Sequence, residues 1–290
     1  MSVRVKKIIL AGIALLAVPA IILCAAVEYL IAPHPAHVGS APADLQAQDI
    51  QIAVAGQRAV AGWYSPGTTG QGEILLLHGI QANRTSQIER MRLLKAQGYG
   101  VLAIDLPAHG ESAGDHVTFG HNESRAVISA VGYLRSQRPG ARIGVIGQSL
   151  GGASLVLAGP DLGADAIILE AVFGDIETAT ANRLHHYSGA LGTLAAPLLV
   201  KAASARLGLS PLDLQPARAI AHVEGAKLVI AGETDIRATP DESRHIFESA
   251  KGPKDFWLVP GAAHVDYFRF APQAYREHVL PFLRKYLKAP

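Results

Sequence analysis

The feature that most constrains the fold is a regular alternation of short apolar runs with helical patterns along most of the 290-residue chain. From residue 73 onward the runs are mostly continuous, as in parallel strands that helices cover on both faces. The expected strands are Ile50–Val54, Val60–Tyr64, Glu73–His78, Gly100–Leu106, Arg142–Gln148, Ala166–Glu170, Lys227–Ala231 and Phe256–Val259. The expected helices are Thr85–Gln97, His121–Gln137, Leu150–Ala158, Asp241–Ala250 and Pro272–Leu287. This order predicts an α/β fold with a doubly wound, mostly parallel sheet whose first two strands form an antiparallel edge.

One interval interrupts this alternation. The segment 173–223 contains no convincing strand, and it includes the Ala/Leu-rich sequence LGTLAAPLLVKAASARLGL, which favours helices. We therefore expect a helical insertion between two strands of the sheet.

The N-terminal segment is apolar enough to cross a membrane. No charged residue occurs from Ile8 to Val27, and a helix of this length spans about 30 Å, the thickness of a bilayer core. Arg4, Lys6 and Lys7 precede the run, so the positive-inside rule predicts a single-pass anchor with a cytoplasmic N-terminus and an exported domain. A cleaved signal peptide that ends near Cys24 and a buried helix of the domain are the alternatives.

The expected organisation has three parts. Residues 1–30 form the basic end and the transmembrane anchor, residues 31–48 a linker, and residues 49–290 a folded domain that contains the insertion. The linker is rich in Pro, Ala and Gly, which is typical of a tether. His34 and His37 within it are too isolated to predict a metal site.

Composition excludes several classes of function. The formal net charge is only +2 and no long basic block occurs, so nothing favours nucleic-acid binding. The single cysteine, Cys24, lies in the apolar N-terminus, so the folded domain has neither a disulfide nor a thiolate metal site. No metal-ligand motif such as H-E-x-x-H occurs either, and we expect no metal and no organic cofactor.

The sequence Gly147-Gln148-Ser149-Leu150-Gly151 matches the pattern G-x-S-x-G. It follows an expected strand and precedes an expected helix, which is the setting that the pattern needs to hold a serine hydroxyl on a sharp turn. The positive end of the following helix favours negative charge that develops near the hydroxyl. We therefore predict that Ser149 is a nucleophile.

A serine hydroxyl needs a general base, and the base needs a carboxylate that orients it. Asp235 follows the expected strand Lys227–Ala231, and His264 follows the strand Phe256–Val259. Both therefore lie beyond the carboxyl ends of strands, at the same edge of the sheet as the serine. Glu233 and Asp241 are the nearest substitutes for the acid.

Acyl transfer also requires backbone N–H groups that face the developing oxyanion. We expect one donor to be the N–H of Leu150, directly after the nucleophile. The other should come from the loop LLLHGIQANR, where the N–H of Ile80 is the expected donor and Gly79 lets the backbone pass close to the substrate.

At this point the sequence resembles the α/β-hydrolase superfamily through LLLHG, AIDLPAHGES, GQSLGG, AGETD and PGAAH in this order. The branch that it resembles most is that of the monoacylglycerol-lipase and serine-aminopeptidase-like hydrolases, which includes membrane-tethered members. The resemblance covers about residues 50–287. It departs from the family segment D-x-R-G-H-G-x-S at Pro107 and Ala108, which replace Arg-Gly. Asp105 and His109 in that segment are expected to be structural.

The resemblance implies that the insertion 173–223 is a lid over an acyl pocket, with Phe173, Leu184, Tyr187 and Leu191 as possible lining residues. The predicted activity is hydrolysis of carboxylic esters, lipid-like or with a small acyl group, through a Ser-His-Asp triad and an acyl-enzyme on the serine. The apolar lid favours a substrate with an apolar acyl group. A peptidase or amidase and a thioesterase with the same triad are alternatives. A membrane-anchored binding protein without activity is the alternative from another class.

Overall fold

A computed structural model describes residues 3–288, and for Val3 and residues 5–16 it describes the backbone alone. Within that range eight strands form one sheet in the order β10-β9-β8-β7-β4-β5-β3-β2. They are β2 (Gln48–Ile52), β3 (Val60–Ser65), β4 (Glu73–Leu77), β5 (Gly100–Ile104), β7 (Ile143–Gln148), β8 (Ala166–Glu170), β9 (Ala226–Gly232) and β10 (Lys254–Val259). Strand β3 is antiparallel to both β2 and β5, and all other neighbours are parallel. The prediction of a mostly parallel sheet with an antiparallel edge is confirmed.

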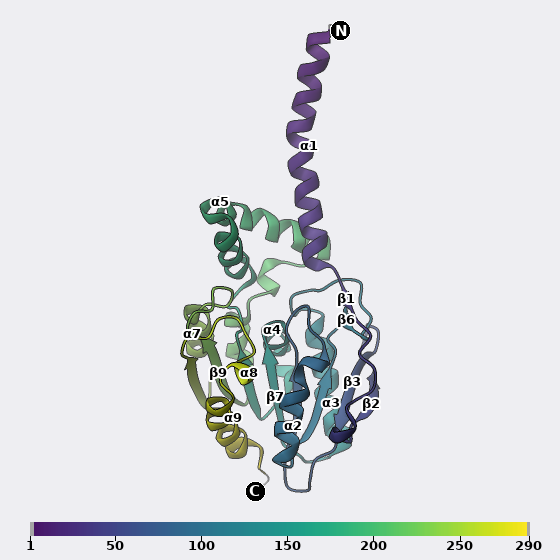
Figure 1. Ribbon diagram of the computed structural model, residues 1–290, viewed down its shortest axis with the longest axis vertical. Helices are drawn as coiled ribbons and strands as arrows, with labels where there is room; N and C mark the ends of the chain where they lie inside the picture. Colours follow the sequence, from purple (N-terminus) through teal and green to yellow (C-terminus); the bar gives the residue numbers. More distant parts are fainter. Residues whose placement is uncertain (1–2, 289–290) are drawn as a thin grey trace.

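The helices cover both faces of this sheet (Figure 1). They are α1 (Val3–Ile31), α2 (Ile88–Ala96), α3 (Glu123–Gln137), α4 (Leu150–Leu157), α5 (Ile176–Leu207), α6 (Pro216–Ala219), α7 (Pro240–Ser249), α8 (Tyr267–Phe270) and α9 (Pro272–Leu287). Helices α2, α3, α4, α7 and α9 lie where the sequence predicts helices. The insertion between β8 and β9 is helical, because it consists of α5, α6 and short 3₁₀ turns.

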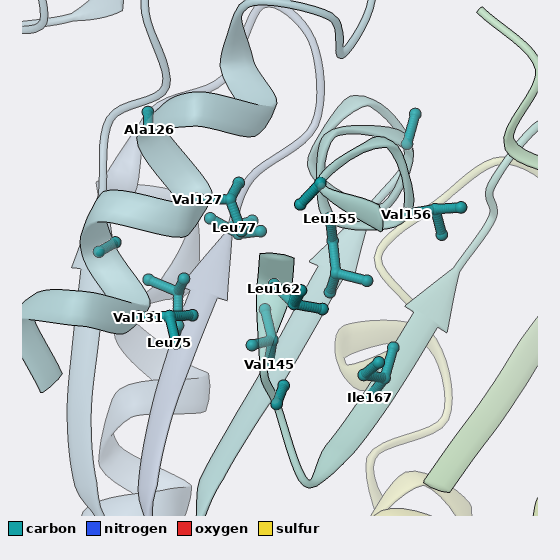
Figure 2. Close-up of a cluster of buried hydrophobic side chains, with 14 of the residues drawn as sticks. Leu75, Leu77, Ala126, Val127, Val131, Val145, Leu155, Val156, Leu162 and Ile167 are labelled. Carbon is teal, nitrogen blue, oxygen red and sulfur yellow. The ribbon is translucent and has the colours of Figure 1, made fainter. Parts of the chain in front are cut away.

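Successive residues of the strands face two different cores, because side chains alternate across a pleated sheet. Leu75 and Leu77 of β4 pack in a cluster with α3 and α4 (Figure 2), whereas Ile74 and Leu76 pack with α2 and α9. All four are at most 1% exposed. Burial of one such side chain stabilises the fold by about 1.5–3 kcal/mol, so coverage on both faces explains the continuously apolar strands.

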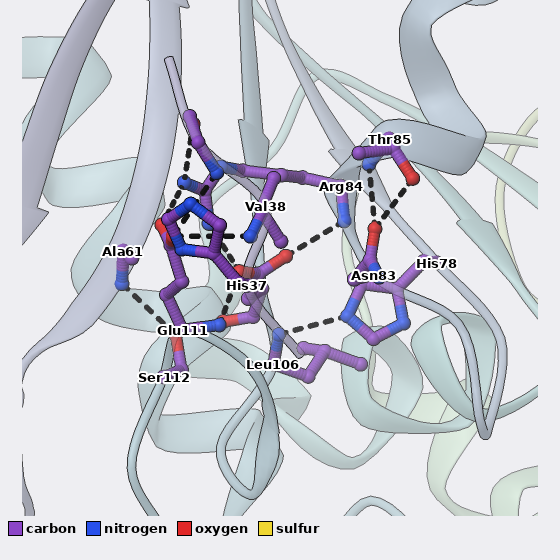
Figure 3. Close-up of polar contacts among 12 residues, drawn as sticks. His37, Val38, Ala61, His78, Asn83, Arg84, Thr85, Leu106, Glu111 and Ser112 are labelled. Carbon is purple, nitrogen blue, oxygen red and sulfur yellow. Dashed lines mark hydrogen bonds and ion pairs between the residues drawn. The ribbon is translucent and has the colours of Figure 1, made fainter. Parts of the chain in front are cut away.

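The segment 31–48 packs along the domain rather than forming the free tether that its composition predicts. Within it β1 (His34–Pro35) pairs in parallel with β6 (His109–Gly110), and Leu45 is buried. The carboxylate of Glu111 accepts a hydrogen bond from the N–H of Val38 at 3.0 Å, as Figure 3 shows. A Pro/Gly-rich segment lacks an alternating pattern, yet its backbone groups still pair with a neighbouring loop, and composition does not reveal that pairing.

Helices α1 and α5 lie together at the end of the molecule toward which the parallel strands point (Figure 1). Their contact buries a small cluster that is separate from the two cores of the sheet and consists of Val27, Ile31, Leu199 and Ala203. An ion pair joins the two helices at its edge, with 2.6 Å between Nε of Arg206 and Oε1 of Glu28. Beyond this contact α1 projects away from the domain.

Helix α5 meets the length and hydropathy expected of a membrane span, with a mean hydropathy of 1.2 over its most apolar window. However, its backbone leaves the helical conformation at Gly189, where φ is 58°, so it is not one straight rod. The predicted anchor Ile8–Val27 falls partly on residues 5–16, whose side chains lie outside the described part of the chain. Only its last part, within the apolar stretch Ala17–Ile31, is described with side chains.

Candidate active site

Ser149 lies on a sharp turn between β7 and α4, at the carboxyl end of the sheet. Its φ and ψ are 49° and −112°, a conformation that residues with a side chain rarely adopt, and its N–H donates to the carbonyl of Glu170 at 2.8 Å. A Cβ atom at Gly147 would lie 2.7 Å from backbone atoms of Gly151 and Gly152. The turn therefore requires glycine at that position, as the sequence pattern predicts.

His264 connects the serine to a buried carboxylate. Its Nε2 lies 3.2 Å from Oγ of Ser149, and its Nδ1 lies 2.7 Å from Oδ2 of Asp235. The other oxygen of this carboxylate accepts hydrogen bonds from the N–H groups of Arg237, at 2.8 Å, and Ala238, at 3.0 Å. With its proton on Nδ1, the imidazole presents a free Nε2 that accepts from the serine hydroxyl. The structure thus brings together all three residues of the predicted triad.

The two predicted oxyanion donors lie beside the serine. Ile80, Leu150 and Ser149 line the same pocket, and a Cβ atom at Gly79 would lie 3.6 Å from Cβ of the serine. In the part of the chain that the structure describes, the N–H groups of Ile80 and Leu150 donate to no acceptor. Leu150 is the first residue of α4, where a helix leaves N–H groups free.

A buried histidine, for which no sequence pattern predicted a role, holds the loop that carries the first predicted donor. The N–H of Leu106 donates to Nε2 of His78 at 3.0 Å, so the proton of the neutral ring lies on Nδ1, which is 2.7 Å from the carbonyl of Gly79. Burial lowers the pKa of His78 to about 3, so the ring is neutral near pH 7. Because this carbonyl and the N–H of Ile80 belong to one peptide group, the imidazole fixes the direction of both.

A buried ionic network, which no sequence pattern indicated, supports the site from behind. Arg90 of α2 lies 2.7 Å from a carboxylate oxygen of Glu170 and 2.8 Å from one of Asp266, and the hydroxyl of Tyr275 donates to Glu170 at 2.5 Å. The carbonyl of Glu170 receives the N–H of Ser149, and Asp266 belongs to the loop that carries the histidine. The network therefore connects α2 and α9 to both sides of the pair formed by Ser149 and His264.

The serine hydroxyl and the imidazole open into a pocket beneath α5. Its walls are mostly apolar, and they include Leu30, Phe119, Phe173, Ile176, Leu184, Leu199, Val200 and Leu214. Apart from the imidazole, its charged or ionisable side chains are those of Arg183 and Arg237. Tyr187 and Leu191, two of the expected lining residues, point away and are 68% and 78% exposed.

The remaining candidate residues form no hydrogen bond with Ser149, Asp235 or His264. Asp105 is buried, accepts the N–H of Arg84 at 2.7 Å and also pairs with the guanidinium of that residue, so its contacts are with the surrounding loops. His109 is buried between two other imidazole rings. Glu233 accepts the N–H of a neighbouring loop at 2.7 Å, and Asp241 lies in the first turn of α7.

Two histidines of the insertion, His185 and His186, are exposed on α5. Within the described part of the chain, no group of three His, Cys, Asp or Glu side chains is placed to hold a metal ion.

A mostly parallel sheet with a serine on a strand–turn–helix, followed in the chain by an aspartate and a histidine beyond later strands, defines the α/β-hydrolase class. The model of a family described as "Alpha/beta hydrolase family" matches residues 74–278, which is more than half of the chain. The chain therefore belongs to the alpha/beta hydrolase family, and this membership supports hydrolase activity. A sequence search of curated proteins found no significant match.

Solved structures have the same fold at low sequence identity. An esterase from Pyrococcus furiosus superposes with a TM-score of 0.72 at 20% identity, over 88% of this chain and 99% of that one. The alpha/beta hydrolase GrgF from Penicillium sp. sh18 gives 0.64 at 17% identity, over 83% and 99%. A thermophilic esterase from Thermogutta terrifontis gives 0.59 at 17% identity, over 82% and 98%.

Proposed function

We propose that this protein is a serine hydrolase that cleaves carboxylic esters with an apolar acyl group. The observation that carries the proposal is the continuous chain of contacts from the hydroxyl of Ser149 through His264 to the buried carboxylate of Asp235. At its serine end, this series of contacts opens into a pocket with mostly apolar walls. Two superposed structures are also named as esterases.

The geometry supports a two-step acyl transfer. His264 takes the proton of Ser149 as its oxygen attacks the ester carbonyl, and the N–H groups of Ile80 and Leu150 stabilise the oxyanion. The protonated imidazole then gives its proton to the departing alcohol. Water, deprotonated by the same imidazole, attacks the acyl-enzyme, and the imidazolium returns that proton to the serine oxygen as the acid leaves. Asp235 holds the proton on Nδ1 and stabilises the imidazolium.

Peptidase, amidase and thioesterase activities would use the same groups. An ester is favoured because the pocket offers an apolar surface for an acyl chain and, among its described lining residues, no carboxylate that would bind the amino terminus of a peptide. A binding protein without activity would not need the strained backbone at Ser149. Such strain is typical of functional sites.

We further propose that α5 acts as a lid over the acyl pocket and that α1 anchors the protein in a membrane. In this arrangement the N-terminus is cytoplasmic, the span is single, and the hydrolase domain lies on the exported side. The proposed parts are an anchor (1–30), a segment that connects it (31–48) and the hydrolase domain (49–290). A membrane-tethered enzyme of the monoacylglycerol-lipase type would combine these features.

The test is a panel of 4-nitrophenyl esters from acetate to palmitate, with aminoacyl 4-nitroanilides as the alternative substrates, on the full chain and on Ser149→Ala. We expect ester hydrolysis, and a loss of about 10⁴-fold or more in kcat in the variant. A fluorophosphonate probe should label the unmodified protein and not the variant. Turnover of anilides with little ester cleavage would favour a peptidase, and absence of both turnover and labelling would contradict the catalytic proposal.

A further inference from the structure

Two positive charges line the pocket that contains the reactive serine. Arg183 lies on α5 and is half-buried, whereas Arg237 is exposed and lies two residues beyond Asp235. In the part of the chain that the structure describes, neither guanidinium forms an ion pair or a hydrogen bond. By contrast, the buried arginines Arg84 and Arg90 each pair with two carboxylates.

The carboxylate of Asp235 attracts Arg183 but forms no ion pair with it. Both oxygens of Asp235 are occupied, one by the imidazole of His264 and the other by two backbone N–H groups. Burial lowers the pKa of Arg183, and the positive charge of Arg237 lowers it further. The two guanidinium groups thus repel each other, and the one on α5 is partly desolvated and has no ion pair among the described residues.

Unpaired guanidinium groups in a pocket of this kind are suited to an anion. A guanidinium presents several N–H donors in a planar fork that matches the oxygens of a carboxylate or a phosphate. An anion between Arg183 and Arg237 would remove their repulsion and replace the water that Arg183 has lost. An uncharged ester would leave both effects in place.

We propose that the substrate carries an anionic group, a phosphate or a carboxylate, which Arg183 and Arg237 bind while its acyl chain lies against the apolar walls. This inference rests on the proposed ester hydrolysis and names the class of ester. Arg237 belongs to the loop of Asp235. Because the acyl chain lies against the apolar walls, the anionic group belongs to the alcohol part of the ester.

Matched substrates test this class. Hydrolysis of 1-hexanoylglycerol 3-phosphate and of 1-hexanoylglycerol is compared in the full chain, purified in a non-ionic detergent. Both have the same short acyl chain and differ in the phosphate alone. We expect kcat/KM to be at least about 10-fold higher for the phosphate ester, because hydrogen bonds to charged groups are the strong ones. Equal rates, or a preference for the neutral ester, would overturn the proposal.

Substitutions assign the effect to the two arginines. Arg183→Gln and Arg237→Gln should each lower kcat/KM for the phosphate ester about 10-fold more than they lower it for the neutral ester. Arg125→Gln, at an exposed position of α3 outside the pocket, is the matched control and should change neither. Equal losses on both esters would mean that the arginines only support the fold of the site, which overturns the proposal.

A binding measurement separates this inference from the proposed reaction. In Ser149→Ala, hexyl phosphate should bind at least about 10-fold more tightly than hexan-1-ol, and the added substitutions Arg183→Gln and Arg237→Gln should abolish the difference. If no ester is cleaved but this preference is found, the proposed hydrolysis fails and the anion site stands. If hexyl phosphate has no advantage, the anion site fails whatever the activity.

Discussion

Substitution of Arg90 tests how far the stability of the protein depends on the buried charges behind the site. In Arg90→Met, Glu170 keeps the hydroxyl of Tyr275 but loses its counter-charge. We expect the free energy of unfolding to fall by about 3–5 kcal/mol at pH 8, because one partner of a buried pair leaves an uncompensated charge. The measurement is urea unfolding, followed by circular dichroism.

The same variant has a defined dependence on pH. Burial already raises the pKa of Glu170, and removal of Arg90 takes away the charge that opposes this rise. If the pKa of a carboxyl is higher in the folded than in the unfolded chain, the group stabilises the fold at pH values below its unfolded pKa. This contribution is lost as the pH rises through its folded pKa. The deficit of Arg90→Met should therefore be smaller at pH 5 than at pH 8.

Arg92 is the matched control for this prediction. It lies on the same helix and pairs with Asp44 and Glu89, but all three side chains are between 42% and 53% exposed. Arg92→Met should lower the free energy of unfolding far less than Arg90→Met does, because water screens exposed ion pairs. Equal losses in the two variants would contradict the role of burial.

At the scale of residues, the sequence predicted the three side chains that the structure brings together and missed what supports them. Ser149, Asp235 and His264 could be chosen because each follows a strand that the hydrophobic pattern already predicted. Arg90 carries no such signal, since its partners are 80 and 176 positions away in the chain. Ala108 shows a further limit, because it replaces a glycine of the family segment and still adopts φ of 63°.

At the scale of elements, the turn between β7 and α4 depends on glycine. In Gly147→Ala the new methyl group would meet backbone atoms of Gly151 and Gly152 at 2.7 Å, which no side-chain rotation relieves. We expect a loss of about 2 kcal/mol or more in stability and at least about a 100-fold loss of esterase activity, because the serine shifts. Thermal unfolding and hydrolysis of a 4-nitrophenyl ester measure the two effects.

Gly132 in the middle of α3 is the control for this change. It is exposed, and a Cβ atom there would meet nothing within 4 Å. Gly132→Ala should stabilise the protein by about 1 kcal/mol, because alanine is the better helix former. If both variants behaved alike, contact at the turn would not be the cause.

The elements themselves followed from the hydrophobic pattern more closely than their connections did. Each expected strand of the sheet lies within two residues of an observed one, because a buried parallel strand leaves a continuous apolar run. The pairing of β1 with β6 left no such trace. It consists of two residues on each side, and its contacts are made by backbone groups that any sequence carries.

At the scale of the whole molecule, α1 forms part of the pocket as well as the proposed anchor. Leu30 lines the pocket, and Val27 and Ile31 are buried against Leu199 and its neighbours on α5. Loss of these contacts would expose apolar surface worth about 1.5–3 kcal/mol for each large side chain. The end of α1 therefore holds α5 over the pocket, whereas the part before residue 17 projects from the domain.

Two truncations separate these roles. Removal of residues 1–16 should release the protein from the membrane fraction, because what remains of the apolar run is too short to span a bilayer. The preference of this form among ester chain lengths should stay that of the full chain. Removal of residues 1–30 should also release it, and should raise KM several-fold for long-chain 4-nitrophenyl esters while acetate changes little. This is expected because Leu30 lines the pocket, and its removal takes more apolar contact from a long acyl chain than from an acetyl group. Equal chain-length profiles in the two truncated forms would show that α1 is an anchor alone, and retention of both in the membrane fraction would show that α1 is not the anchor.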